Sequence, residues 1–165
     1  MYRSLPRTAS TRVNLIDDIR ESLSDEWLPA IYQHKVRSDR TRSIKIEVPK
    51  KENSADIQYT LLGIELKVGR RRFACPDLAT ARYLRVFARI GCQEVALPYD
   101  ITKISPIADE LETSWQRTLI LCDKAARTEQ SVRSRVIKTI REEINKIGPG
   151  EAMPLFDRET KQRKA

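Results

Sequence analysis

Two acidic residues and a lysine near the middle of the chain have the types and spacing that metal-dependent hydrolysis uses. One residue separates Glu65 from Lys67, and Asp56 precedes Glu65 by nine positions. Because alternate residues of a β-strand point to the same side, Glu65 and Lys67 would share one face of a strand. Asp56 and Glu65 could then hold Mg²⁺, while Lys67 orients water or stabilises a phosphate transition state.

This Glu-x-Lys spacing resembles the motif of the PD-(D/E)xK nuclease superfamily, and the predicted order of helix, strands, helix and strand is similar to its core. The resemblance implies a magnesium-dependent nuclease with Asp56 and Glu65 as metal ligands and Lys67 as a catalytic residue. Ala55 stands in place of the proline of the motif. A solvated face of an amphipathic strand also produces Glu-x-Lys without any catalytic role, and both interpretations stay open.

Arginines gather on the same part of the chain, at a predicted hairpin tip and along one face of the helix that follows. They are Arg70, Arg71, Arg72, Arg82, Arg85 and Arg89. Guanidinium groups bind phosphates through paired donors, and such contacts hold a nucleic-acid backbone without reading its sequence. This arginine-rich face predicts a small non-enzymatic protein that binds nucleic acid or a nucleoprotein assembly with salt-sensitive affinity. A solvated face with intramolecular partners is the alternative.

The tail supports a third hypothesis, a protein-interaction or scaffold subunit. Met153, Leu155 and Phe156 form a Met-Pro-Leu-Phe segment after the last predicted helix. The segment resembles the short Leu-Phe-ending peptides with which bacterial replication and repair proteins bind the sliding clamp, although Ala152 stands where those peptides usually carry glutamine. The resemblance implies a protein partner at the last helix and the tail. Docking of the segment on the chain's own core is the alternative.

Composition favours a folded, basic protein. The chain has 165 residues, 40% of them hydrophobic, a net charge of +8 and a pI near 9.6. Residues 43–98 carry 10 basic and 6 acidic side chains, a surplus of four that points to an anionic partner. No apolar run reaches the roughly 20 residues that a membrane span needs, so no membrane partner is expected. The amino terminus lacks the apolar region of a secretory signal, which predicts a cytoplasmic location.

Cysteine and histidine offer little further chemistry. Cys75, Cys92 and Cys122 are far apart and lack Cys-x-x-Cys spacing, so we expect buried free thiols rather than a zinc site or a disulfide framework. His34 is the only histidine, which leaves little basis for a nucleophile–histidine pair. We therefore expect no cofactor, except Mg²⁺ if the nuclease hypothesis holds.

Hydrophobic periodicity predicts the elements that position these residues. Helical spacing begins at about Arg12 and breaks near Pro29, and Asp77 caps a later helix that ends at Gly91. Period-two alternation predicts strands at residues 44–48, 57–61, 64–68, 72–75 and 92–97. The alternation changes phase at Leu62 and Gly63, which indicates either a tight turn or a β-bulge there.

Ser105 and Pro106 predict the start of a long helix. Its apolar stripe lapses over residues 127–131, which indicates a turn with Thr128 capping a last helix; one continuous rod is the alternative. The predicted fold is a single α+β domain at residues 12–148. It has a small, mostly antiparallel sheet with a packed helix, an N-terminal helical segment and a C-terminal pair of long helices. Residues 1–11 are expected to form a flexible arm, and residues 149–165 a tail.

Overall fold

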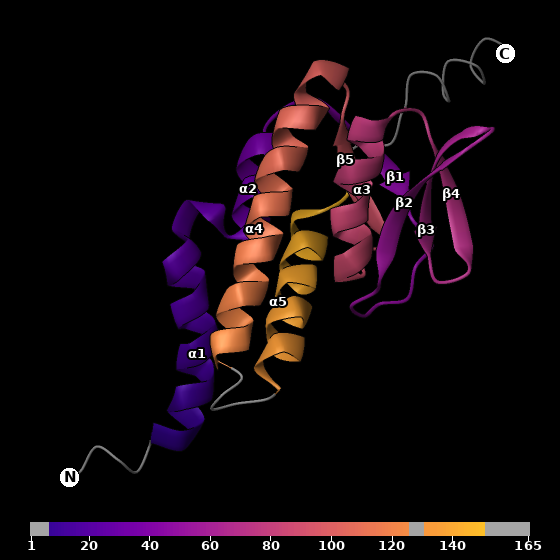
Figure 1. Ribbon diagram of the computed structural model, residues 1–165. Helices are drawn as coiled ribbons and strands as arrows, with labels where there is room; N and C mark the ends of the chain where they lie inside the picture. The colour runs from indigo at the N-terminus through magenta and orange to yellow at the C-terminus, as the bar shows by residue number, and fades with distance from the viewer. Residues whose placement is uncertain (1–6, 126–130, 151–165) are drawn as a thin grey trace, which may run out of the picture.

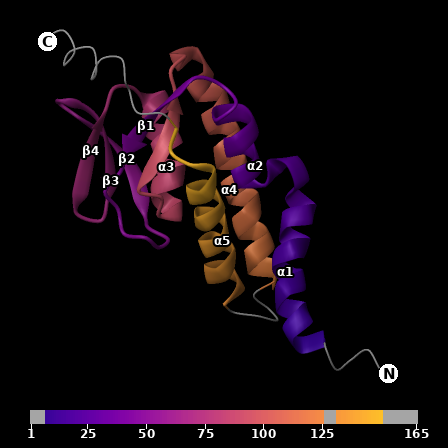
Figure 2. The same ribbon diagram turned by 180° about the vertical axis from the view of Figure 1, so that it is seen from behind.

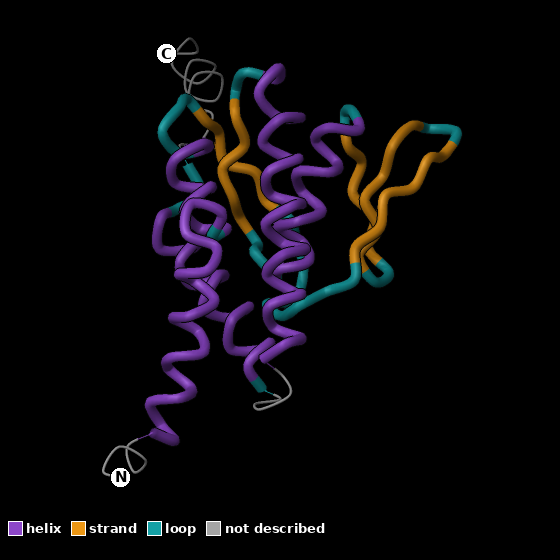
Figure 3. Tube along the Cα trace, turned by 60° about the vertical axis from the view of Figure 1, so that its left-hand side comes forward, coloured by secondary structure: helices purple, strands orange, loops and turns teal. Residues whose placement is uncertain are grey.

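The computed structural model confirms the α+β class: helices form most of the body, a three-stranded antiparallel sheet lies at its edge, and a two-stranded antiparallel sheet lies among the helices (Figures 1 and 3). The structure describes the backbone of residues 7–125 and 131–150, and the side chains of residues 15–125 and 131–150. The elements are α1 (Arg7–Leu23), η2 (Ser24–Glu26), α2 (Leu28–Ile31), η3 (Tyr32–Val36), β1 (Thr41–Lys45), β2 (Ala55–Thr60), β3 (Gly63–Val68), β4 (Arg71–Cys75), α3 (Leu78–Ile90), β5 (Glu94–Pro98), η4 (Ile101–Lys103), α4 (Ile104–Ala125) and α5 (Val132–Ile147).

The strands divide between two sheets, where the sequence predicted one. Strands β2, β3 and β4 form an antiparallel meander, with Asp56 opposite Lys67 and Val68 opposite Arg71. Strand β5 instead pairs with β1, which lies about 50 residues earlier in the chain. Local alternation identifies a strand but not its partner, because pairing depends on how distant elements pack.

Helix α3 occupies the middle of the molecule, between the three-stranded sheet and α4 (Figure 1). Helix α5 packs beside α4, and α1 lies farthest from the three-stranded sheet (Figure 2). Leu66 and Val68 of β3 are buried on the side of the sheet that α3 covers. Asp56 of β2, which lies opposite Lys67 and therefore points to the other side, is exposed. The three-stranded sheet therefore has one core face and one open face.

Local signals fix the ends of α3 as the sequence predicts. The Asp77 carboxylate accepts a hydrogen bond from the backbone N–H of Thr80 at 2.7 Å. Gly91 ends the helix in the left-handed region at φ +94°. A Cβ at this position would lie 2.4 Å from the carbonyl oxygen of Lys51. Glycine here thus serves both the turn and the close passage of the segment between β1 and β2.

Two buried tyrosines connect the helices to the two-stranded sheet. The Tyr83 hydroxyl donates to the carbonyl of Ala96 at 2.5 Å, and the Tyr32 hydroxyl accepts from the N–H of Ala96 at 2.9 Å. Both rings pack on Phe87, with centroids 5.1 and 5.6 Å away. Burial raises the pKa of Tyr32 to about 12. These hydroxyls are therefore neutral structural links rather than acids.

Several predicted boundaries differ from the structure. Helix α1 begins at Arg7, so residues 7–11, expected in the flexible arm, are helical. Strand β1 covers Thr41–Lys45 and ends before Ile46 and Val48, which are buried although they lie outside it. The reason is the length of β5, whose pairing with β1 stops at Glu94 opposite Lys45.

The C-terminal helices are separate, as the lapse in the apolar stripe predicts. Ser105 lies inside α4 rather than capping it; the Asp100 carboxylate accepts from the N–H of Thr102 at 3.0 Å and starts the turn that leads into the helix. Thr128, the predicted cap of α5, lies outside the described residues. None of the helices in the described ranges is long and apolar enough to span a bilayer.

Candidate functional site

The β3–β4 hairpin presents the first three predicted arginines to solvent. Gly69, at φ +64°, makes the tight turn that places Arg70 at the tip and Arg71 opposite Val68. The Arg71 guanidinium lies 3.0 Å from Glu47, and that of Arg72 lies 3.4 Å from Glu65. Both arginine side chains are more than half exposed, so these pairs are weak and exchangeable.

The segment between β1 and β2, residues 46–54, faces this hairpin and is held by hydrogen bonds. The backbone N–H of Ile46 donates to the carbonyl of Gln93 at 2.8 Å, and the Gln93 side chain donates to the carbonyl of Val48 at 2.7 Å. The Asn53 amide donates to three carbonyls, among them that of Ala88 at the end of α3 at 3.1 Å. The segment is therefore fixed relative to the core and is not a loose loop.

Two adjoining hollows lie between this segment and the hairpin, and we call them together the hairpin groove. Their volumes are about 580 and 500 Å³, and both are lined by Pro49 and Arg71. Figure 3 shows the segment and the β3–β4 turn meeting at one end of the three-stranded sheet. The groove is open on the surface, and its size suits a chain of phosphates or an extended backbone rather than an enclosed small molecule.

The carboxylates lining the hairpin groove all have partners. Glu52 accepts from Arg133 at 3.0 Å, Glu94 accepts from the Ser43 hydroxyl at 2.5 Å, and Glu47 is the partner of Arg71.

Three cations that line the hairpin groove form no ion pair among the described residues. Lys45, Lys51 and Arg70 have no carboxylate within ion-pair distance in the part of the chain that the structure describes, and all three are exposed. Lys50, also exposed, lies beside them. The groove therefore offers positive charge that the fold itself does not use.

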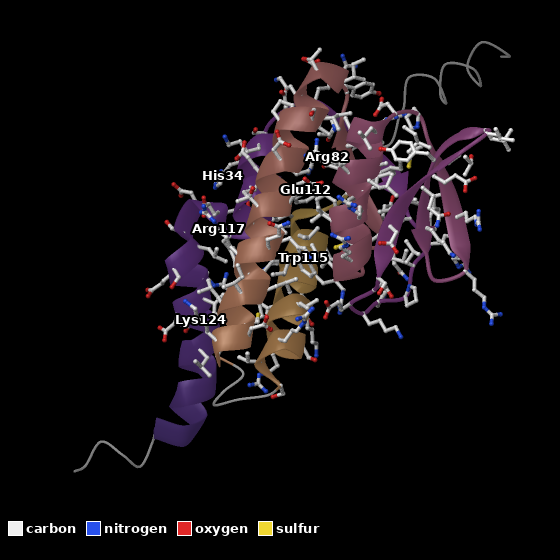
Figure 4. All side chains as sticks on the ribbon, in the orientation of Figure 1. His34, Arg82, Glu112, Trp115, Arg117 and Lys124 are labelled. Carbon is white, nitrogen blue, oxygen red and sulfur yellow. The ribbon has the colours of Figure 1, made fainter. Side chains whose placement is uncertain are left out.

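The arginines of α3 face the other way, toward α4. Arg82 donates to Glu112 at 2.8 and 3.1 Å and also to Asp109, while Arg85 donates to the same Glu112 at 3.2 Å (Figure 4). The side chains of Arg82, Arg85 and Glu112 are only 22, 25 and 22% exposed. Hydrogen bonds to Glu112 and Asp109 raise the pKa of Arg82. These charges fasten two helices together.

Arg89 completes this inward-facing set. Its guanidinium donates to the carbonyl of Ala55 at 3.0 Å and so ties α3 to the start of β2. Burial, followed by repulsion from Arg85, lowers its pKa. Of the six predicted arginines, the structure thus leaves three on the hairpin surface and engages three between elements. The six do not form one continuous face.

The candidate nuclease residues do lie on one surface. Asp56 is directly opposite Lys67 across β2 and β3, and Glu65 follows two positions away on the same open side of the sheet. Glu65 has Arg72 as its nearest cation, at 3.4 Å. The described residues contain no group of three or more histidine, cysteine or acidic side chains arranged to hold a metal ion. Asp56 and Glu65 are the two carboxylates that the nuclease hypothesis assigns as metal ligands.

The last helix, α5, which the sequence suggested as a partner-binding surface, has its apolar side packed against the rest of the chain. The apolar stripe of α5 is buried in the core at Val132, Val136, Ile137, Ile140 and Ile144. Met153, Leu155 and Phe156 lie outside the described residues. The three cysteines are buried free thiols, as the sequence predicts.

Lys45, Lys50 and Lys51 were missed as site residues in the sequence. The signal was a charged stretch around Pro49, which marks a loop but not the surface that the loop faces. Comparison of the chain with protein-family models, with curated proteins and with solved structures found no match.

Proposed function

We propose that the protein binds nucleic acid through the hairpin groove, by contacts to the phosphate backbone. The observation that carries the proposal is the set of exposed cations, Lys45, Lys51 and Arg70, that line the groove without a carboxylate partner among the described residues. Ammonium and guanidinium groups with no internal partner are available to neutralise phosphates and release their counterions. The net charge of +8 adds long-range attraction for a polyanion.

Weak surface pairs extend this site. Arg71 and Arg72 are bound only to exposed or partly exposed carboxylates, which a phosphate can replace at little cost. The fixed backbone of residues 46–54 means that the lysines on it need little ordering when they bind. Contacts of this type give affinity without base recognition, so binding is expected to be tolerant of sequence.

Fluorescence anisotropy with labelled single- and double-stranded DNA and RNA tests the proposal. We expect wild-type binding to weaken strongly between about 50 and 200 mM salt. The variant Lys51→Glu/Arg70→Glu should bind at least about tenfold more weakly, with a slope of log affinity against log salt reduced by about two. Equal affinity of this variant and the wild type would contradict the site, and no wild-type binding at low salt would contradict the function.

A matched control separates the groove from net charge. Lys124→Glu/Lys146→Glu makes the same change in charge at exposed positions near the ends of α4 and α5. Lys124 lies at the end of α4 far from the three-stranded sheet (Figure 4). We expect this control to change affinity only slightly. A loss equal to that of the groove variant would show that binding follows overall charge alone.

A metal-dependent nuclease is the second candidate, and the register of β2 and β3 is the observation that favours it. This register gathers Asp56, Glu65 and Lys67 on one open face. Running the same titrations with EDTA and then with Mg²⁺, and examining the probe afterwards, tests this activity. Cleavage that requires Mg²⁺ and disappears in Glu65→Ala would establish it. An intact probe at all conditions would exclude it for these substrates.

A further inference from the structure

The turn between β2 and β3 carries two leucines that are entirely outside the core. Leu61 and Leu62 have 105 and 95% of their surface exposed, and Tyr59 just before them is 70% exposed. The turn stands at the outer end of the three-stranded sheet, away from the helices (Figures 1 and 3). A leucine pair in this position contributes nothing to the hydrophobic stability of the chain that carries it.

The geometry of the turn does not require leucine. The Thr60 hydroxyl accepts from the N–H of Leu62 at 3.1 Å and donates to the carbonyl of Gly63 at 3.1 Å, so threonine and backbone close the turn. Gly63 supplies the unusual backbone angle, at φ +128°. Neither leucine has a positive φ, so polar turn residues would fit equally well. The leucines are therefore free to serve a contact outside the chain.

The surroundings of the leucines favour a nucleic acid as the occupant. Residues 57–64 and 73–76 contain no charged side chain, and of the carboxylates that flank them, Glu65 is paired with Arg72 and Asp77 caps α3. The opposite end of the same sheet carries Lys67 and Arg70–Arg72, with the hairpin groove beside them. Strand β3 joins the two ends through six residues, a span of roughly 20 Å at about 3.3 Å per residue. A duplex seated on the basic end therefore reaches the leucines.

We propose that Leu61 and Leu62 insert between neighbouring base pairs of duplex DNA whose phosphates are held by the hairpin groove. Apolar wedges on rigid elements unstack a base step and bend the duplex, and wider contact with the protein offsets the cost of unstacking. Tyr59 lies next to the wedge and can stack on an exposed base face. This inference rests on the proposed function, since the groove supplies the affinity that brings the duplex to the turn.

The test uses a duplex with the fluorescent base 2-aminopurine, whose emission rises when it leaves the stack, together with anisotropy of an end label. We expect wild-type protein to raise the 2-aminopurine emission on binding. Leu61→Ser/Leu62→Ser should abolish the rise and weaken binding roughly tenfold. Ile101→Ser, at a 71% exposed apolar position on η4, is the control and should leave both signals as in the wild type.

The two readouts distinguish failure of the wedge from failure of the function. Tight binding with no 2-aminopurine response, or with the same response in the double variant, overturns the insertion while the groove stands. Absence of any anisotropy change overturns the proposed function and the insertion with it. If the wild type binds vesicles of anionic lipid and the double variant does not, while DNA binding is equal in both, the leucines serve a membrane surface instead. Urea unfolding should give equal midpoints for the wild type and for Leu61→Ser/Leu62→Ser, because both leucines lie outside the core.

Discussion

The arginines of α3 and those of the β3–β4 hairpin show two opposite uses of the same side chain. Arg82 and Arg85 are about three-quarters buried and share Glu112 of α4. Arg71 and Arg72 are 59 and 55% exposed. The comparison teaches that a guanidinium becomes structural when another element presents a carboxylate to it away from water. Where no such partner is presented, the charge remains available to a ligand.

The two sets of arginines are also expected to contribute differently to the free energy of unfolding. Hydrogen bonds between charged groups in partly buried positions contribute about 1.5–3 kcal/mol, and removing one partner leaves the other with its full cost of desolvation. Exposed ion pairs contribute about 0–1 kcal/mol. The α3–α4 network should therefore dominate stability, while the hairpin pairs should matter for binding and little for folding.

The largest effect is expected from Glu112→Gln. The change leaves Arg82 with Asp109 alone and Arg85 without its carboxylate, so we expect the free energy of unfolding to fall by about 2 kcal/mol. Urea unfolding measures it. Glu110→Gln is the matched control, because Glu110 is exposed and lies 3.6 Å from Lys35. Equal unfolding midpoints for the two variants would contradict a structural role for the α3 arginines.

A smaller effect on the free energy of unfolding is expected when the pH is lowered. Burial by itself would raise the pKa of Glu112, but the hydrogen bonds and charges of Arg82 and Arg85 outweigh it, and the pKa lies below its ordinary value of 4.5. A lowered pKa in the folded state stabilises the protein above about pH 4.5, and this contribution is lost as the pH falls through the folded-state value.

Urea unfolding at about pH 6 and pH 3 measures this contribution. The wild type should lose more stability across the interval than Glu112→Gln, because the variant has no carboxylate at this position to protonate. The Asp39–Lys103 pair, which also lowers the pKa of its aspartate, is present in both proteins and cancels in the difference. Parallel losses in the two proteins would show that Glu112 contributes nothing to acid sensitivity.

The smallest effect on stability is expected from Glu47→Gln in the hairpin groove. The exposed ion pair with Arg71 disappears, so the free energy of unfolding should change by no more than about 0.5 kcal/mol. Affinity for nucleic acid should rise about two- to threefold at low salt, because the change frees Arg71 and removes a negative charge beside the phosphates. Anisotropy titration measures this affinity, with Glu110→Gln as the control because it makes the same change in net charge. Weaker binding by Glu47→Gln would contradict the groove.

Much of the fold was predictable because its signals are local. Alternation over residues 57–75 predicted the strands of the three-stranded sheet, Asp77 and Gly91 fixed α3, and the lapse after residue 126 separated the last two helices. Each of these rests on hydrogen bonding or steric preference within a few residues. The open face with Asp56, Glu65 and Lys67 follows from the same alternation together with a short turn.

By itself, the sequence determined the fold class, the arginine positions and the excess of positive charge. Only the tertiary structure decided which arginines are free. Arg82 meets Asp109 and Glu112, which lie 27 and 30 residues further along the chain, and residues 46–54 come to face Arg70 and Arg71. The physical reason is that a side chain's partners are set by the packing of distant elements. No short-range pattern records whether a charge will meet a carboxylate or water.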